Sequence, residues 1–211
     1  MAIMRRTIVY IDGFNLFYGA LRNTPHKWLN PYALAQLVLK NHTITAIKYF
    51  TALVQPRPQD PDQPVRQQAY LRALATLPQV EIIYGHFLSH PVTMRLVQPP
   101  SSGSPYVSVM KTEEKGSDVN LATHLMHDAH MKRMEVAVLI TNDSDLVEPI
   151  RLLRRDLKLT IGVLNPHKKP AAEIMKAATF IRPIRAGVLA ASQFPVQLTD
   201  ARGIFHKPQS W

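Results

Sequence analysis

The chain has 211 residues, 46% hydrophobic and 19% charged, a balance typical of one globular domain. It lacks cysteine, which excludes disulfides, thiolate metal sites and cysteine nucleophiles, and no apolar run reaches the roughly 18 residues that a membrane span requires. Its 25 Lys and Arg outnumber 15 Asp and Glu, and the net charge of +10 favours an anionic partner such as nucleic acid or a membrane surface.

The first half of the chain alternates between short apolar strands and helices. Residues 1–6 lead directly into the first strand without the apolar core of a signal peptide, and the absence of cysteine fits a reducing cytoplasm. Apolar runs rich in β-branched residues predict strands at residues 7–11, 45–54 and 80–88. Helical spacing, or a proline that opens the first turn, predicts helices at residues 15–22, 31–40 and 65–77.

The second half resumes this alternation after an interruption. Residues 89–111 contain four prolines and a glycine, and we interpret them as an insertion in which 93–97 pairs with 106–110 as a β-hairpin. The pattern then predicts helices at 116–131, 145–157 and 171–178, and strands at 136–140, 159–164 and 180–184. We therefore expect one α/β domain over residues 1–185, followed by a loose C-terminal tail, 186–211, without clear periodicity.

The predicted strands are apolar throughout and alternate with helices, which indicates a parallel sheet covered on both faces. In such sheets the chemistry lies in the crevice beyond the carboxyl ends of the strands. Asp12 and Asp143 each follow the end of a predicted strand, although they are 131 positions apart. The sequence therefore predicts that these two carboxylates meet at one edge of the sheet.

Asp118 joins this pair by a separate line of reasoning. Leu121, Ala122, Leu125 and Ala129 form one apolar stripe along the predicted helix, and Asp118 lies on the same stripe at its N-terminal end. A carboxylate on a buried face costs several kcal/mol unless it is paired or binds a metal. The alternative is a first-turn aspartate that the helix dipole favours.

Turns and helix caps could also account for several of these acidic and polar residues. Asp12 precedes Gly13 in a common turn dipeptide, and Asn15 has the side chain of a helix cap. Asp145, with Glu148 three residues later, resembles the start of a capping box. We leave open whether Asp145 is a cap or a fourth member of a metal site, whereas the sequence around Asp143 suggests no such local role.

Converging carboxylates without histidine or cysteine ligands suit a hard cation such as Mg²⁺ or Mn²⁺. Without a metal, such closely packed charges would repel and some would be protonated. Lys115 lies beside Asp118 and is a candidate to bind substrate phosphate. His124, His127 and His130 lie off the apolar stripe, and we expect them to form a solvated face.

The motifs Tyr-Ile-Asp-Gly-Phe-Asn (10–15), Lys-Gly-Ser-Asp-Val-Asn-Leu-Ala (115–122) and Asn-Asp-Ser-Asp-Leu (142–146) occur in this order on these elements. Together they resemble the NYN family, the LabA-like branch of the PIN-like nuclease superfamily, from about residue 7 to residue 184. The resemblance implies a Rossmann-like three-layer α/β/α sandwich with a mostly parallel central sheet. It also implies a Mg²⁺- or Mn²⁺-dependent ribonuclease.

The resemblance further implies a role for each residue of these motifs. Asp12, Asp118 and Asp143 would be catalytic carboxylates that hold the metal, and Asp145 would be a fourth catalytic acid. Asn15 would orient substrate or a water molecule, and Asn142 would border the site. Many relatives carry an aspartate two turns into the middle helix, where this chain has His124, so this site would bind metal more weakly if that acid is a ligand.

We therefore expect a metal-dependent ribonuclease, and specifically an endonuclease that hydrolyses RNA phosphodiester bonds. The main alternative is a non-catalytic RNA-binding or regulatory module that retains the pocket. A nuclease that acts on DNA would have the same pocket residues, whereas a haloacid-dehalogenase-type phosphatase needs a second aspartate where Phe14 stands. The sequence leaves open whether the chain forms a homodimer.

Overall fold

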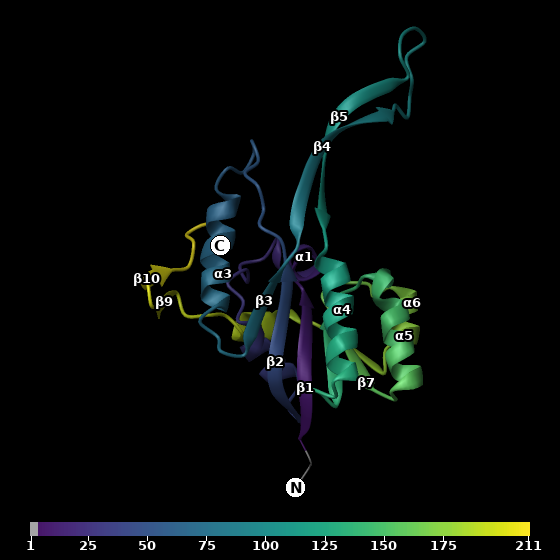
Figure 1. The fold of residues 1–211 in the computed structure, drawn as a ribbon. Helices are drawn as coiled ribbons and strands as arrows, with labels where there is room; N and C mark the ends of the chain where they lie inside the picture. Colours follow the sequence, from purple (N-terminus) through teal and green to yellow (C-terminus); the bar gives the residue numbers. More distant parts are fainter. Residues whose placement is uncertain (1–3) are drawn as a thin grey trace.

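A computed structural model describes residues 4–211. Residues 1–3 lie outside it. They belong to the expected domain 1–185 and to the N-terminal stretch in which we expect no signal peptide. The central sheet has six strands in the order β3-β2-β1-β6-β7-β8, and all neighbours are parallel (Figure 1). Their bounds are β1 Arg5–Asp12, β2 His42–Thr51, β3 Val80–Tyr84, β6 Val136–Ile140, β7 Thr160–Asn165 and β8 Phe180–Pro183. The predicted parallel sheet is confirmed.

Helices cover both faces of this sheet. Helices α2 (Pro31–Val38), α3 (Gln63–Leu74) and α7 (Ala186–Ala191) pack on one face, and α4 (Ser117–His130), α5 (Val147–Asp156) and α6 (Ala172–Ala177) pack on the other. Side chains of β1 alternate between the two cores, because Val9 contributes to the first and Tyr10 to the second. The three-layer α/β/α sandwich expected from the family resemblance is confirmed.

Two of the helices next to the predicted aspartates are irregular. The expected helix at 15–22 is a short helix α1 (Gly13–Leu16) followed by a π-helical turn η1 (Phe17–Leu21). The expected helix at 145–157 starts as a 3₁₀ turn, η2 (Ser144–Leu146), before α5. Among residues 4–211, no helix combines the length and hydrophobicity needed to cross a bilayer.

The expected insertion is a long antiparallel hairpin that projects from the body of the protein (Figure 1). Strands β4 (His86–Arg95) and β5 (Tyr106–Lys115) pair along their whole length, so the hairpin is longer than the predicted one. The predicted strand 80–88 is divided at Gly85, where the chain crosses the start of α4. A Cβ atom at Gly85 would collide with the backbone carbonyl of Lys115 as well as with the carboxylate of Glu114, so a larger residue does not fit there.

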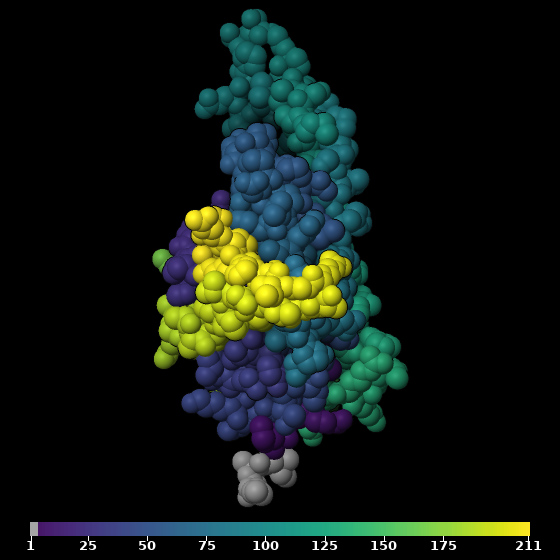
Figure 2. Space-filling view, turned by 90° about the vertical axis from the view of Figure 1, so that its left-hand side faces the viewer, coloured from purple at the N-terminus to yellow at the C-terminus, as the bar shows by residue number. Residues whose placement is uncertain are grey.

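The expectation of a loose tail after residue 186 is wrong. This segment forms α7 and a two-stranded hairpin, β9 (Gln197–Asp200) with β10 (Gly203–His206). It lies as a band across one face of the molecule in Figure 2. Leu189, Phe194 and Phe205 are buried in the same core as Trp28. These three anchors are 5 and 11 positions apart, which is too wide a spacing to give a periodic signal in the sequence.

Candidate metal centre

Three of the predicted aspartates converge at the carboxyl edge of the sheet. Asp12 ends β1, Asp143 follows the neighbouring strand β6, and Asp118 lies in the first turn of α4. One carboxylate oxygen from each lies within 4.8 Å of the others. The convergence follows from the topology, because β1 and β6 are parallel neighbours and α4 begins at the same edge.

Asp12 is the most enclosed acid of the three, with only 5% of its surface exposed. One of its oxygens accepts a hydrogen bond from the Asn15 amide at 2.9 Å, which caps α1, and the other accepts from the Thr141 hydroxyl at 3.3 Å. Burial raises the pKa of Asp12 to about 7, and the charges of Asp118 and Asp143 add to this effect against the two hydrogen bonds. In the metal-free protein, Asp12 therefore holds a proton at pH values well above the usual range for a carboxyl group.

Asp118 is half-buried and feels the charges of its acidic neighbours. Burial raises its pKa first, followed by the charges of Asp143, Glu114 and Asp145. Two acids of the cluster thus have raised pKa values for the same two reasons, desolvation and like charge. A cation placed between their oxygens would relieve both.

Asp143, and not Asp145, is the local helix cap. The carboxylate of Asp143 accepts from the Asp145 amide at 3.0 Å at the start of η2, and the Asp143 amide donates to Thr141 Oγ1 at 3.1 Å. The capping-box pattern made Asp145 the candidate cap, and that interpretation is wrong. The side chain of Asp145 is exposed and lies outside the group of three, although its charge reaches Asp118.

Asn15 and Asn142 fasten the loops around the three acids. Asn15 Oδ1 accepts from the Asn142 amide at 2.9 Å and lies 3.1 Å from Nε2 of His167. The carboxamide of Asn142 turns toward the loop before α6, where it accepts from the Ala171 amide at 2.7 Å and donates to the Lys169 carbonyl at 3.2 Å. Asn142 therefore borders the site through its backbone, and its side chain holds a neighbouring loop.

Lys115 lies at the end of β5, where its side chain is exposed. Its ammonium group pairs with Glu113 at 3.2 Å, and Glu113 also pairs with Lys111 at 2.6 Å. The neighbouring Glu114 turns the other way and receives hydrogen bonds from the amide and hydroxyl of Ser117. Glu114, rather than Lys115, faces the three aspartates.

The acids open into a cavity of about 340 Å³. Its walls contribute four carboxylates, two basic side chains and three aromatic rings, among others: Asp12, Glu114, Asp118, Asp143, Arg57, His167, Phe14, Tyr18 and Phe87. Neither Arg57 nor His167 was predicted to belong to the site. Both come from loops rich in proline or lysine, and no motif marks either of them.

His124 is not the solvated residue that we expected. Its ring packs edge-on against Phe50, and its Nδ1 lies 3.2 Å from the buried ammonium group of Lys48. Of the three histidines on this helix, only His127 and His130 are exposed. The position where many relatives carry an aspartate thus lies against Lys48 and does not line the acid cavity.

The parallel α/β/α sandwich with an aspartate cluster at its carboxyl edge has the arrangement of a nuclease-like domain. A family model described as the NYN domain matches residues 6–185, and the chain belongs to this family. The recognition made from the three motifs is thereby confirmed.

Two comparisons with individual proteins add to this assignment. The chain is 32% identical over 235 aligned residues to 6-hydroxy-3-succinoylpyridine 3-monooxygenase HspA of Pseudomonas putida strain DSM 28022 / S16, covering 98% of this chain and 75% of that protein. The crystal structure of a protein of unknown function, VPA0982 from Vibrio parahaemolyticus RIMD 2210633, superposes with a TM-score of 0.58 at 11% identity. That match covers 88% of this chain and 96% of the other, and it supports the fold alone.

Proposed function

We propose that this protein is a metal-dependent ribonuclease, an endonuclease that hydrolyses RNA phosphodiester bonds at the aspartate cluster. The observation that carries the proposal is the meeting of Asp12, Asp118 and Asp143 within 4.8 Å from three separate segments. Three acids this close, one of them buried and two half-buried, are unfavourable in an empty site, and a bound cation is their simplest compensation. The net charge of +10 supports RNA as the partner.

The donor set fits Mg²⁺ or Mn²⁺, because it consists of carboxylate oxygens alone. Two oxygens bound to one Mg²⁺ at about 2.1 Å can be at most about 4.2 Å apart. Adjacent ligands of an octahedral ion lie about 3.0 Å apart, so the three oxygens, which lie within 4.8 Å of one another, would draw together by up to about 1.8 Å. We propose Asp12, Asp118 and Asp143 as the ligands.

A bound divalent cation would activate a water for in-line attack on the phosphorus and stabilise the leaving oxygen. The chain would supply position and charge. Asn15, fixed by Asn142 and His167, orients the substrate or a water at the inner wall. Arg57 lines the same cavity and offers the guanidinium that pairs best with phosphate oxygens.

Cleavage of labelled RNA in Mn²⁺ tests the proposal. We expect the Asp12→Asn/Asp143→Asn double variant to lose at least about 100-fold in rate, because it removes two of three charged ligands. The matched control is Asp62→Asn/Asp156→Asn, which replaces two exposed acids and retains activity. Equal degradation by all three proteins would identify a contaminant and contradict the proposal.

Two further arms separate the alternatives. DNA of the same sequence tests sugar specificity. RNA binding without cleavage would favour a non-catalytic RNA-binding module.

The cysteine-free sequence fits a reducing compartment, and we propose the cytoplasm as the location. Sedimentation of the purified protein would settle whether it forms a homodimer.

A second candidate function follows from the name of the relative in Pseudomonas putida. Identity of 32% across 98% of this chain favours testing hydroxylation of a hydroxypyridine acid, a reaction that needs dioxygen and a reductant. The assay supplies 6-hydroxy-3-succinoylpyridine with NADH in air and follows the pyridine spectrum. This candidate would be favoured over the nuclease if the double aspartate variant still converts the pyridine and the wild-type protein leaves RNA intact.

A further inference from the structure

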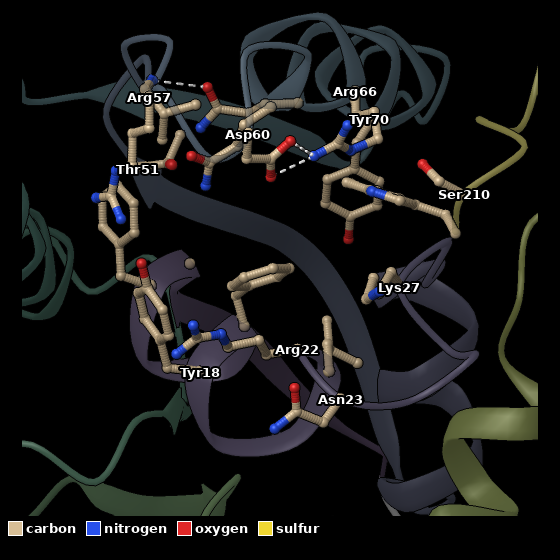
Figure 3. A pocket seen from close by; sticks show the side chains of 18 of the residues that line it. Tyr18, Arg22, Asn23, Lys27, Thr51, Arg57, Asp60, Arg66, Tyr70 and Ser210 are labelled. Atoms are coloured by element: carbon tan, nitrogen blue, oxygen red, sulfur yellow. Dashed lines mark hydrogen bonds and ion pairs between the residues drawn. The ribbon is translucent and has the colours of Figure 1, made fainter.

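A second and larger cavity adjoins the acid site. It has a volume of about 590 Å³ and lies between the α1–η1 turn, the loop after β2, the start of α3 and the end of the chain (Figure 3). Phe14, Tyr18, Val54 and Arg57 line both cavities, so the two spaces meet at these side chains. The volume falls within the roughly 300–1,000 Å³ typical of cavities that enclose a small organic molecule such as a nucleotide.

The cavity offers flat aromatic surfaces to a ligand. Tyr18 is 46% exposed at the junction with the acid site, and the guanidinium of Arg22 lies 5.4 Å from the centre of its ring. Trp211, at the end of the chain, lines the cavity and packs against the buried Tyr70. Exposed rings on a rigid wall are the usual platform for stacking a planar heterocycle.

The cavity is also cationic. Arg22, Lys27, Arg57 and Arg66 line it, and Asp60 is its single acidic side chain. Asp60 pairs with Arg66 at 2.5 Å, as the dashed lines in Figure 3 show. Within residues 4–211 the other three cations have no ion-pair partner. An anionic ligand would supply the missing counter-charge.

We propose that this cavity binds a nucleotide of the RNA substrate adjacent to the phosphate that is cut, which rests on the proposed ribonuclease function. Tyr18 stacks on the base at the entrance. Arg57 stands where the two cavities join and binds the phosphate that links the stacked nucleotide to the one at the acid site. Arg22 and Lys27 bind the next phosphate. The aromatic and cationic groups thus follow the repeat of base and phosphate along one strand.

A free hydroxypyridine carboxylate shares this chemistry, because it also joins a planar heterocycle to an anion. Two features favour the nucleotide. Three unpaired cations exceed what one carboxylate needs, and the position of the cavity directly beside the acid site suits a ligand that continues beyond the cavity. The binding experiment therefore includes both kinds of ligand.

Anisotropy of a fluorescein-labelled hexaribonucleotide, measured in EDTA, tests the assignment without any cleavage. We expect Tyr18→Ala to weaken binding about tenfold, in line with the value of one stacked base, and Arg57→Gln to weaken it about fivefold. The matched controls are Tyr106→Ala on the projecting hairpin and Arg155→Gln on α5, which leave affinity unchanged. Circular dichroism verifies folding, and Tyr18→Leu and Arg22→Gln serve as second variants.

Competition identifies the ligand. AMP and UMP should displace the labelled RNA and quench part of the tryptophan fluorescence, because Trp211 lines the cavity whereas Trp28 is fully buried. Displacement by 6-hydroxy-3-succinoylpyridine but by neither nucleotide would overturn the assignment. So would wild-type RNA affinity in both Tyr18→Ala and Arg57→Gln, even if cleavage depends on the aspartates. Weakened binding in these variants beside aspartate-independent degradation would instead contradict the nuclease and leave the nucleotide site standing.

Discussion

Two opposing influences set the pKa of the Asp12 carboxyl group. It must accept hydrogen bonds from Asn15 and Thr141, which favour its charged form, and it is buried beside Asp118 and Asp143, which disfavour that form. Burial and like charge dominate and raise its pKa to about 7. Because the folded-state pKa exceeds the unfolded value of about 3.9, the contribution of Asp12 to the stability of the metal-free protein is lost as pH rises from about 4 to 7.

Asp12→Asn should therefore stabilise the metal-free protein at pH 8. Asparagine keeps the oxygen that caps α1 and removes the buried charge. A shift of about three pKa units corresponds to at most about 4 kcal/mol, which sets the upper limit of the gain. Urea unfolding in EDTA at pH 5 and pH 8 measures it, with the exposed Asp156→Asn as control. A variant that is less stable than wild type at pH 8 would contradict this view of the site.

At the scale of elements, a buried polar network fastens α4 to the sheet. Asp128, fully buried on α4, accepts from the Tyr10 hydroxyl at 2.8 Å and pairs with Lys48 at 2.6 Å and Arg133 at 2.9 Å. Burial alone would raise the pKa of Asp128, but the hydrogen bonds from Lys48, Tyr10 and Arg133 lower it. The network fixes the position of the helix whose first turn carries Asp118.

Asp128→Ala should cost about 3–5 kcal/mol of unfolding free energy, because it leaves Lys48 buried without its closest partner. Asp156→Ala, which breaks an exposed pair with Arg155 at the end of α5, should change stability by less than about 1 kcal/mol. Chemical unfolding at pH 7 measures both. Equal stabilities for the two variants would show that α4 does not depend on the network.

Local patterns predicted the elements that carry the acids, but not their neighbours. The local sequence was sufficient to predict that Asp12 follows a buried strand and that Asp118 lies on the apolar stripe of a helix. Both features are present in the structure. Arg57 and His167 reach the site from irregular loops, whose paths depend on tertiary packing. The buried network around Asp128 was not predicted either, because its partners Lys48 and Tyr10 come from two separate strands.

At the scale of the whole molecule, the C-terminal segment is part of the core. Phe205 is buried in the same cluster as Trp28, and its ring stacks under Arg72 at 4.1 Å. Arg72 in turn forms a two-point ion pair with Asp200. Sequence periodicity could not reveal this packing, because the anchors are widely spaced and their partners lie far along the chain.

Phe205→Ala should therefore destabilise the protein by about 3 kcal/mol, the lower end of the range for buried phenylalanine. Ile204→Ala is the matched control, because the neighbouring side chain is exposed and its loss should change stability by less than about 0.5 kcal/mol. Thermal and urea unfolding measure both variants. If Phe205→Ala unfolds like wild type, the segment contributes little to the core.

Anomalous diffraction from crystals soaked in Mn²⁺ tests most directly whether the three aspartates share an ion. We expect one strong peak about 2.0–2.3 Å from carboxylate oxygens of Asp12, Asp118 and Asp143, and its loss in Asp12→Asn/Asp143→Asn crystals. A map without a peak between these side chains, at a Mn²⁺ concentration that supports RNA cleavage, would contradict the shared metal site.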